Sequence, residues 1–308
     1  MLQLLYLGRN ETHVLVFRCR CCRRVPADGS RRGRPERTPS SRMTRVAWLT
    51  DIHLNFLDDR EVRSFMEDIV SYKPDAVLLG GDIGEAPSLT GYLLALEDHI
   101  VRPIYFVLGN HDFYRGSITD VRDEMFRLTQ RSRWLKWLPA AGVVELTPEI
   151  GLAGHDCWAD GRLGDYANSD VMLNDYILIK ELAWLDSQQR LAQLNALGDE
   201  AADYLLQVLP AAFDRFRRMV VLLHVPPFEG ACWHEGHISD KHFLPHFGCK
   251  IVGEALVAIM KARPDCEMTV LCGHMHSFGH VRILPNLSVT TGGAEYGKPH
   301  VQEVFKFE

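Results

Sequence analysis

Side chains that can bind metal ions occur at five places in this chain, each directly after a strand-like apolar run. The motifs that follow these runs are Asp51-Ile52-His53, Gly81-Asp82, Gly109-Asn110-His111-Asp112, His224 and Gly273-His274-Met275-His276. Buried parallel strands read as continuous apolar runs, and α/β proteins bind their ligands beyond the carboxyl ends of such strands. The pattern therefore predicts a sheet edge at which carboxylate, amide and imidazole donors meet around metal.

The donor types limit the chemistry of such a site. Carboxylate and amide oxygens with neutral imidazole, and no thiolate, suit Mn, Fe or Zn better than a structural zinc site. Where one residue separates two donors, as in Asp51-Ile52-His53, an extended backbone would point both side chains the same way. If such a set held two divalent ions a few ångströms apart, the ions would lower the pKa of a shared water and could clamp a phosphate.

The order of the five motifs (D-x-H, GD, GNHD, H and GHxH) resembles that of the calcineurin-like metallophosphoesterases, over roughly residues 45–308. The resemblance implies an α/β fold, a β-sandwich of mixed sheets flanked by helices in four αββα layers. It implies a dinuclear hydrolase in which a hydroxide bridging two divalent ions attacks phosphorus in line. The implied ligands are Asp51, His53 and His276 for one ion, Asn110, His224 and His274 for the other, and Asp82 as the bridge.

His111 has a separate predicted role, because it lies beside the ligand Asn110 but would itself point at the phosphate. An imidazole can protonate or hydrogen-bond a leaving oxygen, so His111 is the candidate general acid. Asp112 is predicted to hold that ring in one tautomer, as carboxylates close to metal ligands often do.

Departures from well-known branches of the family narrow the function. Phosphoprotein phosphatases carry GDxxDRG and GNHE, whereas here the GD motif continues as Ile83-Gly84-Glu85 and the later motif ends in Asp112. Purple acid phosphatases place a tyrosine ligand at the position of Glu85. The hypothesis that remains is a small-molecule phosphatase or phosphodiesterase. An Mre11-like nuclease and a non-catalytic metal-binding scaffold of the same fold stay open as alternatives, although the intact ligand set argues against the scaffold.

The charge of the chain is divided between a basic N-terminal stretch and an acidic remainder. Residues 1–42 hold ten Arg, no Lys and three acidic residues, a charge of +7, and the overall charge of −6 leaves −13 on the rest. Binding of nucleic acid depends on Lys and Arg contacts to phosphate, for which an acidic body is a poor match. We therefore expect a small phosphorylated substrate and no nucleic-acid partner, and the oligomeric state stays open.

The predicted metallophosphoesterase domain occupies residues 43–308. Residues 1–42 are expected to be a disordered extension, because residues 18–42 are rich in Arg, Pro, Ser and Gly; alternatively, Met43 is the natural start. The eight cysteines suggest no disulfide framework, and no apolar run approaches the ~20 residues of a membrane helix. A cytoplasmic protein without a membrane segment is therefore expected.

Within the domain, apolar runs alternate with amphipathic segments, which predicts parallel strands joined by crossover helices. Helices are predicted over 58–72, over 88–100 with Ser88 as cap, and over 117–138. Short paired strands are predicted over 143–146 and 150–153, and antiparallel strands that complete a sheet over 280–284, 287–291 and 301–307. A helical insertion over about 159–218 is expected to pack on the sheet or, alternatively, to cover the substrate.

Other polar residues carry less specific predictions. The His-rich stretch 232–249 is expected to shape the substrate pocket, with a separate zinc site or plain surface histidines as alternatives. Its members are Cys232, His234, His237, His242, His246 and Cys249. Arg162 either reaches a phosphate oxygen or is a surface arginine. His155 and Asp156 are assigned structural roles.

Overall fold

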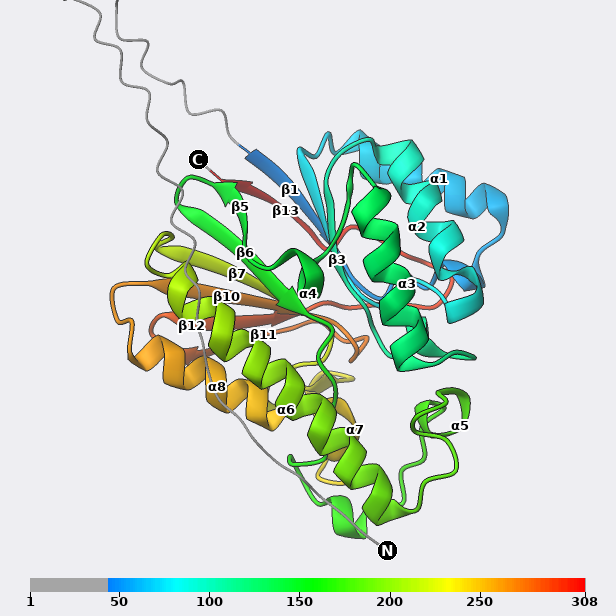
Figure 1. Ribbon diagram of the computed structural model, residues 1–308, viewed down its shortest axis with the longest axis vertical. Coiled ribbons are helices and arrows are strands. Elements are labelled where there is room, and N and C mark those ends of the chain that lie inside the picture. Colours follow the sequence, from blue (N-terminus) through cyan, green and yellow to red (C-terminus); the bar gives the residue numbers. More distant parts are fainter. Residues whose placement is uncertain (1–43, 308) are drawn as a thin grey trace, which may run out of the picture. The chain divides into compact units, whose positions relative to one another are not determined.

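Two large mixed sheets form the centre of the fold (Figure 1). The computed structural model describes residues 44–307, and the predicted extension of residues 1–42 lies outside them. The five-stranded sheet has the order β13-β1-β2-β3-β4, formed by Glu303–Phe307, Thr44–Leu49, Ala76–Gly80, Ile104–Val107 and Leu135–Trp137. The six-stranded sheet has the order β11-β12-β10-β7-β6-β5, formed by Gly279–Leu284, Leu287–Thr291, Glu267–Cys272, Arg218–Leu223, Ile150–His155 and Val144–Thr147. Neighbouring strands are parallel except at the edges, where β13, β11 and β5 pair antiparallel.

Alternating side chains explain why the two sheets pack face to face. Val46 and Trp48 of β1 share a buried cluster with Leu152 and Leu222 of the other sheet. Ala47, between them in the sequence, points to the opposite face and joins the cluster under the helices. Fully burying a side chain the size of leucine contributes about 1.5–3 kcal/mol, so these alternating positions hold the sandwich together.

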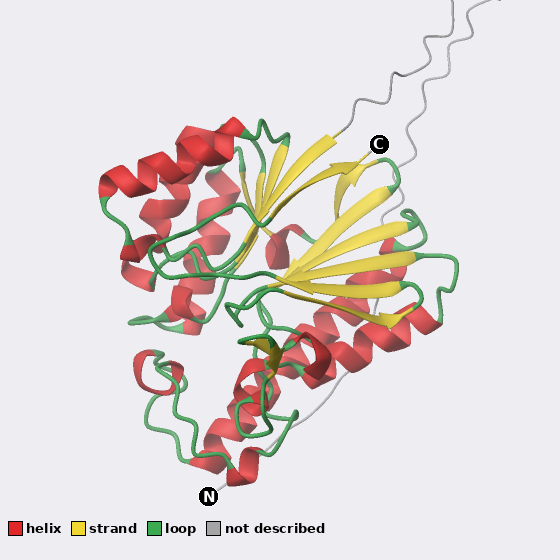
Figure 2. Cartoon of the chain, turned by 180° about the vertical axis from the view of Figure 1, so that it is seen from behind, coloured by secondary structure: helices red, strands yellow, loops and turns green. Residues whose placement is uncertain are grey.

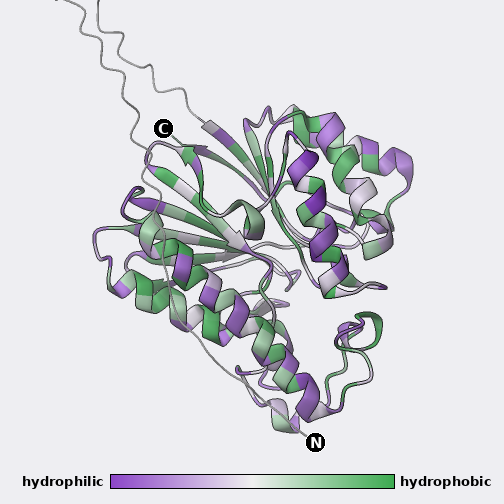
Figure 3. Cartoon of the chain, in the orientation of Figure 1, coloured by the Kyte–Doolittle hydropathy of each residue, from purple (hydrophilic) through white to green (hydrophobic). Residues whose placement is uncertain are grey.

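Helices cover the outer face of each sheet (Figure 2). On the five-stranded sheet these are α1 (Asp59–Ser71), α2 (Ala86–Ile100) and α3 (Ile118–Arg131), and on the six-stranded sheet α6 (Ser187–Ala212) and α8 (Lys250–Lys261). Hydrophilic and hydrophobic residues alternate along α6 and α8, as expected of helices with one face on a core (Figure 3). The predicted αββα sandwich is therefore confirmed.

Shorter elements connect these layers. They are α4 (Leu138–Ala141), α5 (Asp175–Leu178), α7 (Leu244–Phe247), the β8–β9 hairpin (Trp233–His234 and His237–Ile238) and 3-10 turns at Leu54–Phe56, His111–Phe113, Tyr166–Asn168 and Glu229–Ala231. In the described part of the chain, no helix is both long and apolar enough to cross a bilayer.

The start of α1 shows how local sequence sets an element boundary. The Asp58 side chain accepts hydrogen bonds from the backbone N–H groups of Arg60 and Glu61, and the Glu61 side chain accepts from the backbone of Asp58. This reciprocal capping box satisfies N–H groups that have no partner within the helix. The helix predicted over 58–72 is therefore confirmed to within a residue at each end.

Two other helix predictions need correction. Ser88 does not cap α2, because the helix begins at Ala86 and the Ser88 hydroxyl donates to the carbonyl of Glu85 from inside the first turn. The helix predicted over 117–138 ends at Arg131. Leu135–Trp137 instead forms β4 beside β3, because its alternating side chains bury both apolar residues when the segment pairs as a strand.

The C-terminal strands complete two sheets instead of one. Strands β11 and β12 pair antiparallel as predicted, but β12 also runs parallel to β10. The last predicted strand, β13, crosses to the five-stranded sheet and pairs antiparallel with β1. The paired strands predicted over 143–146 and 150–153 are confirmed as β5 and β6, and β6 extends into the sheet beside β7.

Candidate metal centre

The five donor motifs come from the carboxyl ends of both sheets. Strands β1, β2 and β3 lead into Asp51, Asp82 and Asn110, whereas β7 and β10 of the other sheet lead into His224 and His274. The expectation of a single sheet edge was therefore wrong. Because the sheets pack face to face, the ends of both sheets still deliver their donors to one place.

Four of the predicted ligands form a first cluster. The donor atoms of Asp51, His53, Asp82 and His276 all lie within 4.8 Å of one another. The Nε2 atom of His276 is 3.5 Å from Oδ1 of Asp51, and Nε2 of His53 is 3.6 Å from Oδ2 of Asp82. Within residues 44–307, this is the only group of three or more His, Cys, Asp or Glu side chains close enough to share an ion.

The other three predicted ligands form a second cluster on the far side of Asp82. Nε2 of His224 is 3.1 Å and Nδ1 of His274 is 3.0 Å from Oδ1 of Asn110. Nε2 of His224 is also 3.5 Å from Oδ1 of Asp82. The two oxygens of Asp82 therefore face different clusters, Oδ2 toward His53 and Oδ1 toward His224.

The electrostatics of the two clusters fit divalent cations. Burial, together with the charges of Asp51 and Asp112, raises the pKa of the Asp82 carboxyl well above its usual range. Burial lowers the pKa of His53 to about 2 and that of His274 to about 3, so both rings are neutral and offer lone pairs. Carboxylates and neutral imidazoles that face one another in a buried site are stabilised by a shared metal ion.

Most of the candidate ligands have an unusual backbone conformation. The left-handed φ values are 51° for Asp51, 39° for His53, 52° for Asp82, 69° for His274 and 54° for His276. Such a conformation costs a non-glycine residue on the order of 1–3 kcal/mol and is often found at functional sites. The extended backbone expected across Asp51-Ile52-His53 and His274-Met275-His276 was therefore wrong. Left-handed turns position these donors instead.

Two glycines of the motifs allow the donors to approach closely. A Cβ atom on Gly109 would lie 2.2 Å from Oδ1 of Asp82, and one on Gly273 would lie 2.0 Å from Oδ2 of Asp51. Both distances are far shorter than any van der Waals contact. The motif glycines are therefore part of the geometry that brings the carboxylates into the site.

Residues 44–278 match the calcineurin-like phosphoesterase family, a span that includes every candidate ligand. The chain belongs to this family. Over 83 residues, this phosphoesterase is 32% identical to a probable cyclic nucleotide phosphodiesterase of Pseudoalteromonas sp. (strain SM9913), a match that covers 22% of this chain and 31% of the relative. The match therefore spans about a third of that relative's length.

Solved structures share the fold of this phosphoesterase at low sequence identity. A phosphopantetheinyl hydrolase from Mycobacterium tuberculosis has a TM-score of 0.61 and 14% identity, over 86% of this chain and 96% of the other. A dimetal phosphatase from Danio rerio has a TM-score of 0.52 and 14% identity, over 81% and 87% of the two chains. At such identities the likeness shows the fold alone.

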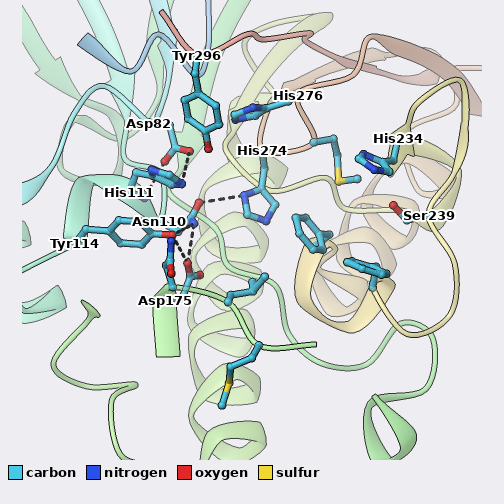
Figure 4. Close-up of a pocket in the computed structure, with 16 residues that line it drawn as sticks. Asp82, Asn110, His111, Tyr114, Asp175, His234, Ser239, His274, His276 and Tyr296 are labelled. Carbon is cyan, nitrogen blue, oxygen red and sulfur yellow. Dashed lines mark hydrogen bonds and ion pairs between the residues drawn. The ribbon is translucent and has the colours of Figure 1, made fainter. Parts of the chain in front are cut away.

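The place of Asp175 in the site was not predicted. This buried residue begins α5, within the predicted insertion. Its Oδ1 accepts hydrogen bonds from the Tyr114 hydroxyl at 2.7 Å and from Nδ2 of Asn110 at 2.9 Å. A carboxylate only accepts, so the Asn110 amide must turn its nitrogen to Asp175 and its oxygen to His274 (Figure 4).

Asp112 was predicted to hold the His111 ring, but its carboxylate bonds elsewhere. Its Oδ1 accepts from the backbone N–H groups of Ile83 and Gly84, and its Oδ2 accepts from that of Gly109. These bonds tie the loops after β2 and β3 together. The structure therefore places Asp112 as a support of the loops that carry the donors, since the buried backbone N–H groups occupy both of its oxygens.

His111 points into the site from the loop after β3. Its ring stacks on Tyr114 with centroids 4.2 Å apart, and its Nε2 lies 4.0 Å from Oδ2 of Asp82. Burial, aided by the charges of His224 and His276, lowers the pKa of His111 to about 4. The ring is then neutral near pH 7 and has a single N–H to donate.

Tyr296 is a second residue whose place in the site was not predicted. It comes from the loop between β12 and β13, and its ring centroid lies 4.6 Å from that of His53 and 4.9 Å from that of His276. The residue is 46% exposed, and its ring packs against two members of the first cluster. It lies between the strands predicted over 287–291 and 301–307, in a segment where local sequence offered no functional signal.

A pocket of about 410 Å³ opens beside the two clusters of this phosphoesterase. Only one part of the predicted insertion lines this pocket. Helix α6 packs on the six-stranded sheet, as the first interpretation of the insertion expected. Residues 172–175 line the pocket, as the second interpretation expected.

The His-rich stretch lies along the same pocket. His234 lines it, together with Ser239 and Phe243 from the same stretch. His246 is buried, with its Nδ1 2.5 Å from the Tyr176 hydroxyl and its Nε2 2.9 Å from the hydroxyl of Ser169. These positions support the interpretation that the stretch shapes the pocket.

The remaining polar residues have structural partners. Arg162 forms ion pairs with Asp160 and Asp199 and is not among the residues that line the pocket. These contacts fit the surface arginine of the second interpretation. Asp156 accepts hydrogen bonds from the backbone of Leu108 and from the indole of Trp137. His155 accepts from the backbone N–H of Cys157. The structural roles expected of His155 and Asp156 agree with these contacts.

Proposed function

We propose that this phosphoesterase is a dinuclear enzyme that hydrolyses a phosphate ester bond of a small substrate. The observation that carries the proposal is the position of Asp82, whose Oδ2 lies 3.6 Å from His53 and whose Oδ1 lies 3.5 Å from His224. A carboxylate between two donor clusters fits a bridge between two divalent ions, and the donor types suit Mn, Fe or Zn. When bound, such ions activate water, neutralise phosphate oxygens and fix in-line geometry.

His111 is proposed to contact the substrate. Its ring lies beside Asp82 and lines the pocket, so a phosphate held at the centre would meet its Nε2. Because its pKa is lowered to about 4, the ring is neutral near pH 7, and its N–H would stabilise the charge that develops on the leaving oxygen by donating a hydrogen bond as the ester bond breaks.

Asn110 is proposed to act as a ligand whose orientation other residues fix. The hydrogen bond from its Nδ2 to Asp175, together with the Tyr114 hydroxyl on the same carboxylate, keeps its Oδ1 facing His224 and His274. Residues that orient ligands in this way typically contribute ten- to hundredfold to metal affinity.

The substrate is proposed to be a small phosphorylated molecule and not a nucleic acid. A pocket of about 410 Å³ is within the range of small-molecule sites. The name of the curated relative supports including phosphodiesters among the candidates. Five cysteines in the described chain are free thiols, which supports a reducing compartment such as the cytoplasm.

Hydrolysis of two chromogenic esters by the Mn-loaded full chain tests the proposal. We expect turnover of 4-nitrophenyl phosphate, bis(4-nitrophenyl) phosphate, or both, to be lost with a chelator and restored by added metal. Two bound ions without turnover of either ester would favour the scaffold alternative. Cleavage of DNA without turnover of small esters would favour the Mre11-like nuclease.

A further inference from the structure

The pocket beside the metal centre has two chemically different walls. One wall consists of residues of the centre, among them Asn110, His111, His274 and His276. The other wall is apolar and comes from segments far apart in the chain. Its side chains are Met172 and Leu173 of the insertion, Phe243 and Phe247 of the His-rich stretch, and Met275.

The apolar wall is continuous with the proposed ligands. The ring of Phe247 lies against that of His274, with centroids 5.0 Å apart, and Phe243 lies 6.2 Å from Phe247. A group bonded to a phosphate at the centre would therefore meet aromatic surface directly. Figure 4 shows His234 and Ser239 on the other side of His274 from Asp82 and His111.

Two members of this wall are unusually exposed for their type. Met172 is 61% exposed and Phe243 is 46% exposed, although both have large apolar side chains. Apolar surface gathered around a concave site commonly marks a place where a ligand buries it, and aromatic faces favour flat partners.

The side chains that line the pocket disfavour a second anionic group on the ligand. Among the described residues that line it, none is Lys or Arg, and the acidic ones are Asp82 and Asp175. A second phosphate on the substrate would lose hydration against the apolar wall without gaining a cationic partner. His234 and Ser239 leave only a small polar region for the edge of a ring.

We propose that the pocket binds an aromatic or heteroaromatic group of a phosphate ester that carries a single phosphoryl group. The proposal rests on the proposed function, because it takes the metal centre as the place where the phosphoryl group binds. Met172 and Phe243 are the residues assigned to recognition of the ring.

Binding of phosphonates tests this assignment without requiring turnover. The probes are methylphosphonate, phenylphosphonate and benzene-1,4-diphosphonate, titrated by calorimetry into the Mn-loaded full chain. We expect phenylphosphonate to bind at least about tenfold more tightly than methylphosphonate, because its ring buries apolar surface. The diphosphonate, whose second charge points away from the centre, should bind more weakly than phenylphosphonate.

Substitutions assign the preference to the wall. Phe243→Ala and Met172→Ala change exposed side chains, and each should lower the phenyl-to-methyl ratio of affinities severalfold. Phe126→Ala is the matched control, since Phe126 is 50% exposed on α3 and does not line the pocket. It should leave the ratio unchanged.

Each outcome separates the two proposals. Equal affinities for methyl- and phenylphosphonate, or a ratio that neither Phe243→Ala nor Met172→Ala lowers, would overturn the pocket assignment and leave ester hydrolysis standing. A strong phenyl preference that depends on Phe243, without turnover of any ester, would support the pocket and overturn the enzyme. Failure of all three phosphonates to bind while an ester is still turned over would overturn the pocket assignment alone, and the same failure without turnover would overturn both proposals.

Discussion

Replacing Asp175 with Ala tests whether the insertion controls the metal centre. Asp175 is 3% exposed, and its Oδ1 accepts from both Tyr114 and Asn110. Its removal frees the Asn110 amide to rotate, so that the nitrogen can turn toward His224 and His274, where only an oxygen can bind metal. We therefore expect Asp175→Ala to weaken one metal site selectively.

The expected magnitude follows from the two lost contacts. A hydrogen bond to a charged acceptor contributes about 1.5–3 kcal/mol, and only the bond from Nδ2 of Asn110, at 2.9 Å, bears directly on the ligand. Since a tenfold change in affinity corresponds to about 1.4 kcal/mol, loss of this orientation should weaken the second ion about 10- to 100-fold. The first cluster, which Asp175 does not contact, should keep its affinity.

Calorimetric titration of Mn²⁺ into metal-free protein measures both affinities in one experiment. Asp175→Asn is the conservative variant, because its oxygen can occupy the position of Oδ1 and still accept from Asn110. It should recover most of the lost affinity. Asp165→Ala is the matched control, since Asp165 lies in the same insertion but pairs with Lys241 and does not line the pocket. Wild-type affinity for both ions in Asp175→Ala would refute the reasoning.

Two further predictions concern the centre itself. Asp82→Ala should lower the turnover of any accepted ester by at least roughly a thousandfold, because both ions lose their shared ligand; near-normal turnover measured with added metal would exclude the two-metal assignment. His111→Ala should keep both ions but lose roughly a hundred- to ten-thousandfold in rate, with a smaller loss for a nitrophenolate leaving group than for an alkoxide. Kinetics on two esters with metal content measured alongside would check this. Equal losses would indicate that His111 positions the phosphate, and lost metal would make it a ligand.

The sandwich, and the convergence of the seven candidate ligands on one place, could be predicted from sequence because their signals are local. Each donor directly follows an apolar run, and a run of that kind forms a buried strand almost wherever it occurs. The division of the runs between two sheets was not predicted, because strand order depends on which crossover packs on which face. Local pattern also misassigned Leu135–Trp137, where pairing with β3 overrides helical spacing.

The residues that orient the site could not be predicted, because their partners are distant in sequence. Asp175 and Asn110 are 65 positions apart, and nothing in the insertion distinguishes this aspartate from its neighbours. Asp112 follows His111 directly, so a contact between them was the natural expectation. The structure instead directs it to the backbone of Ile83 and Gly84, whose buried N–H groups need an acceptor. The left-handed backbone of the ligands likewise depends on the assembled site.

The stoichiometry of bound metal tests the central claim most directly. The full chain is stripped of metal, loaded with Mn²⁺ or Zn²⁺, freed of excess ion and analysed for metal and protein. Because the two oxygens of Asp82 face separate donor clusters, the account predicts about two ions per chain, and fewer in Asp82→Ala. A content near zero would contradict the metal centre, and a content that stays at one under saturating metal would contradict the bridging role of Asp82.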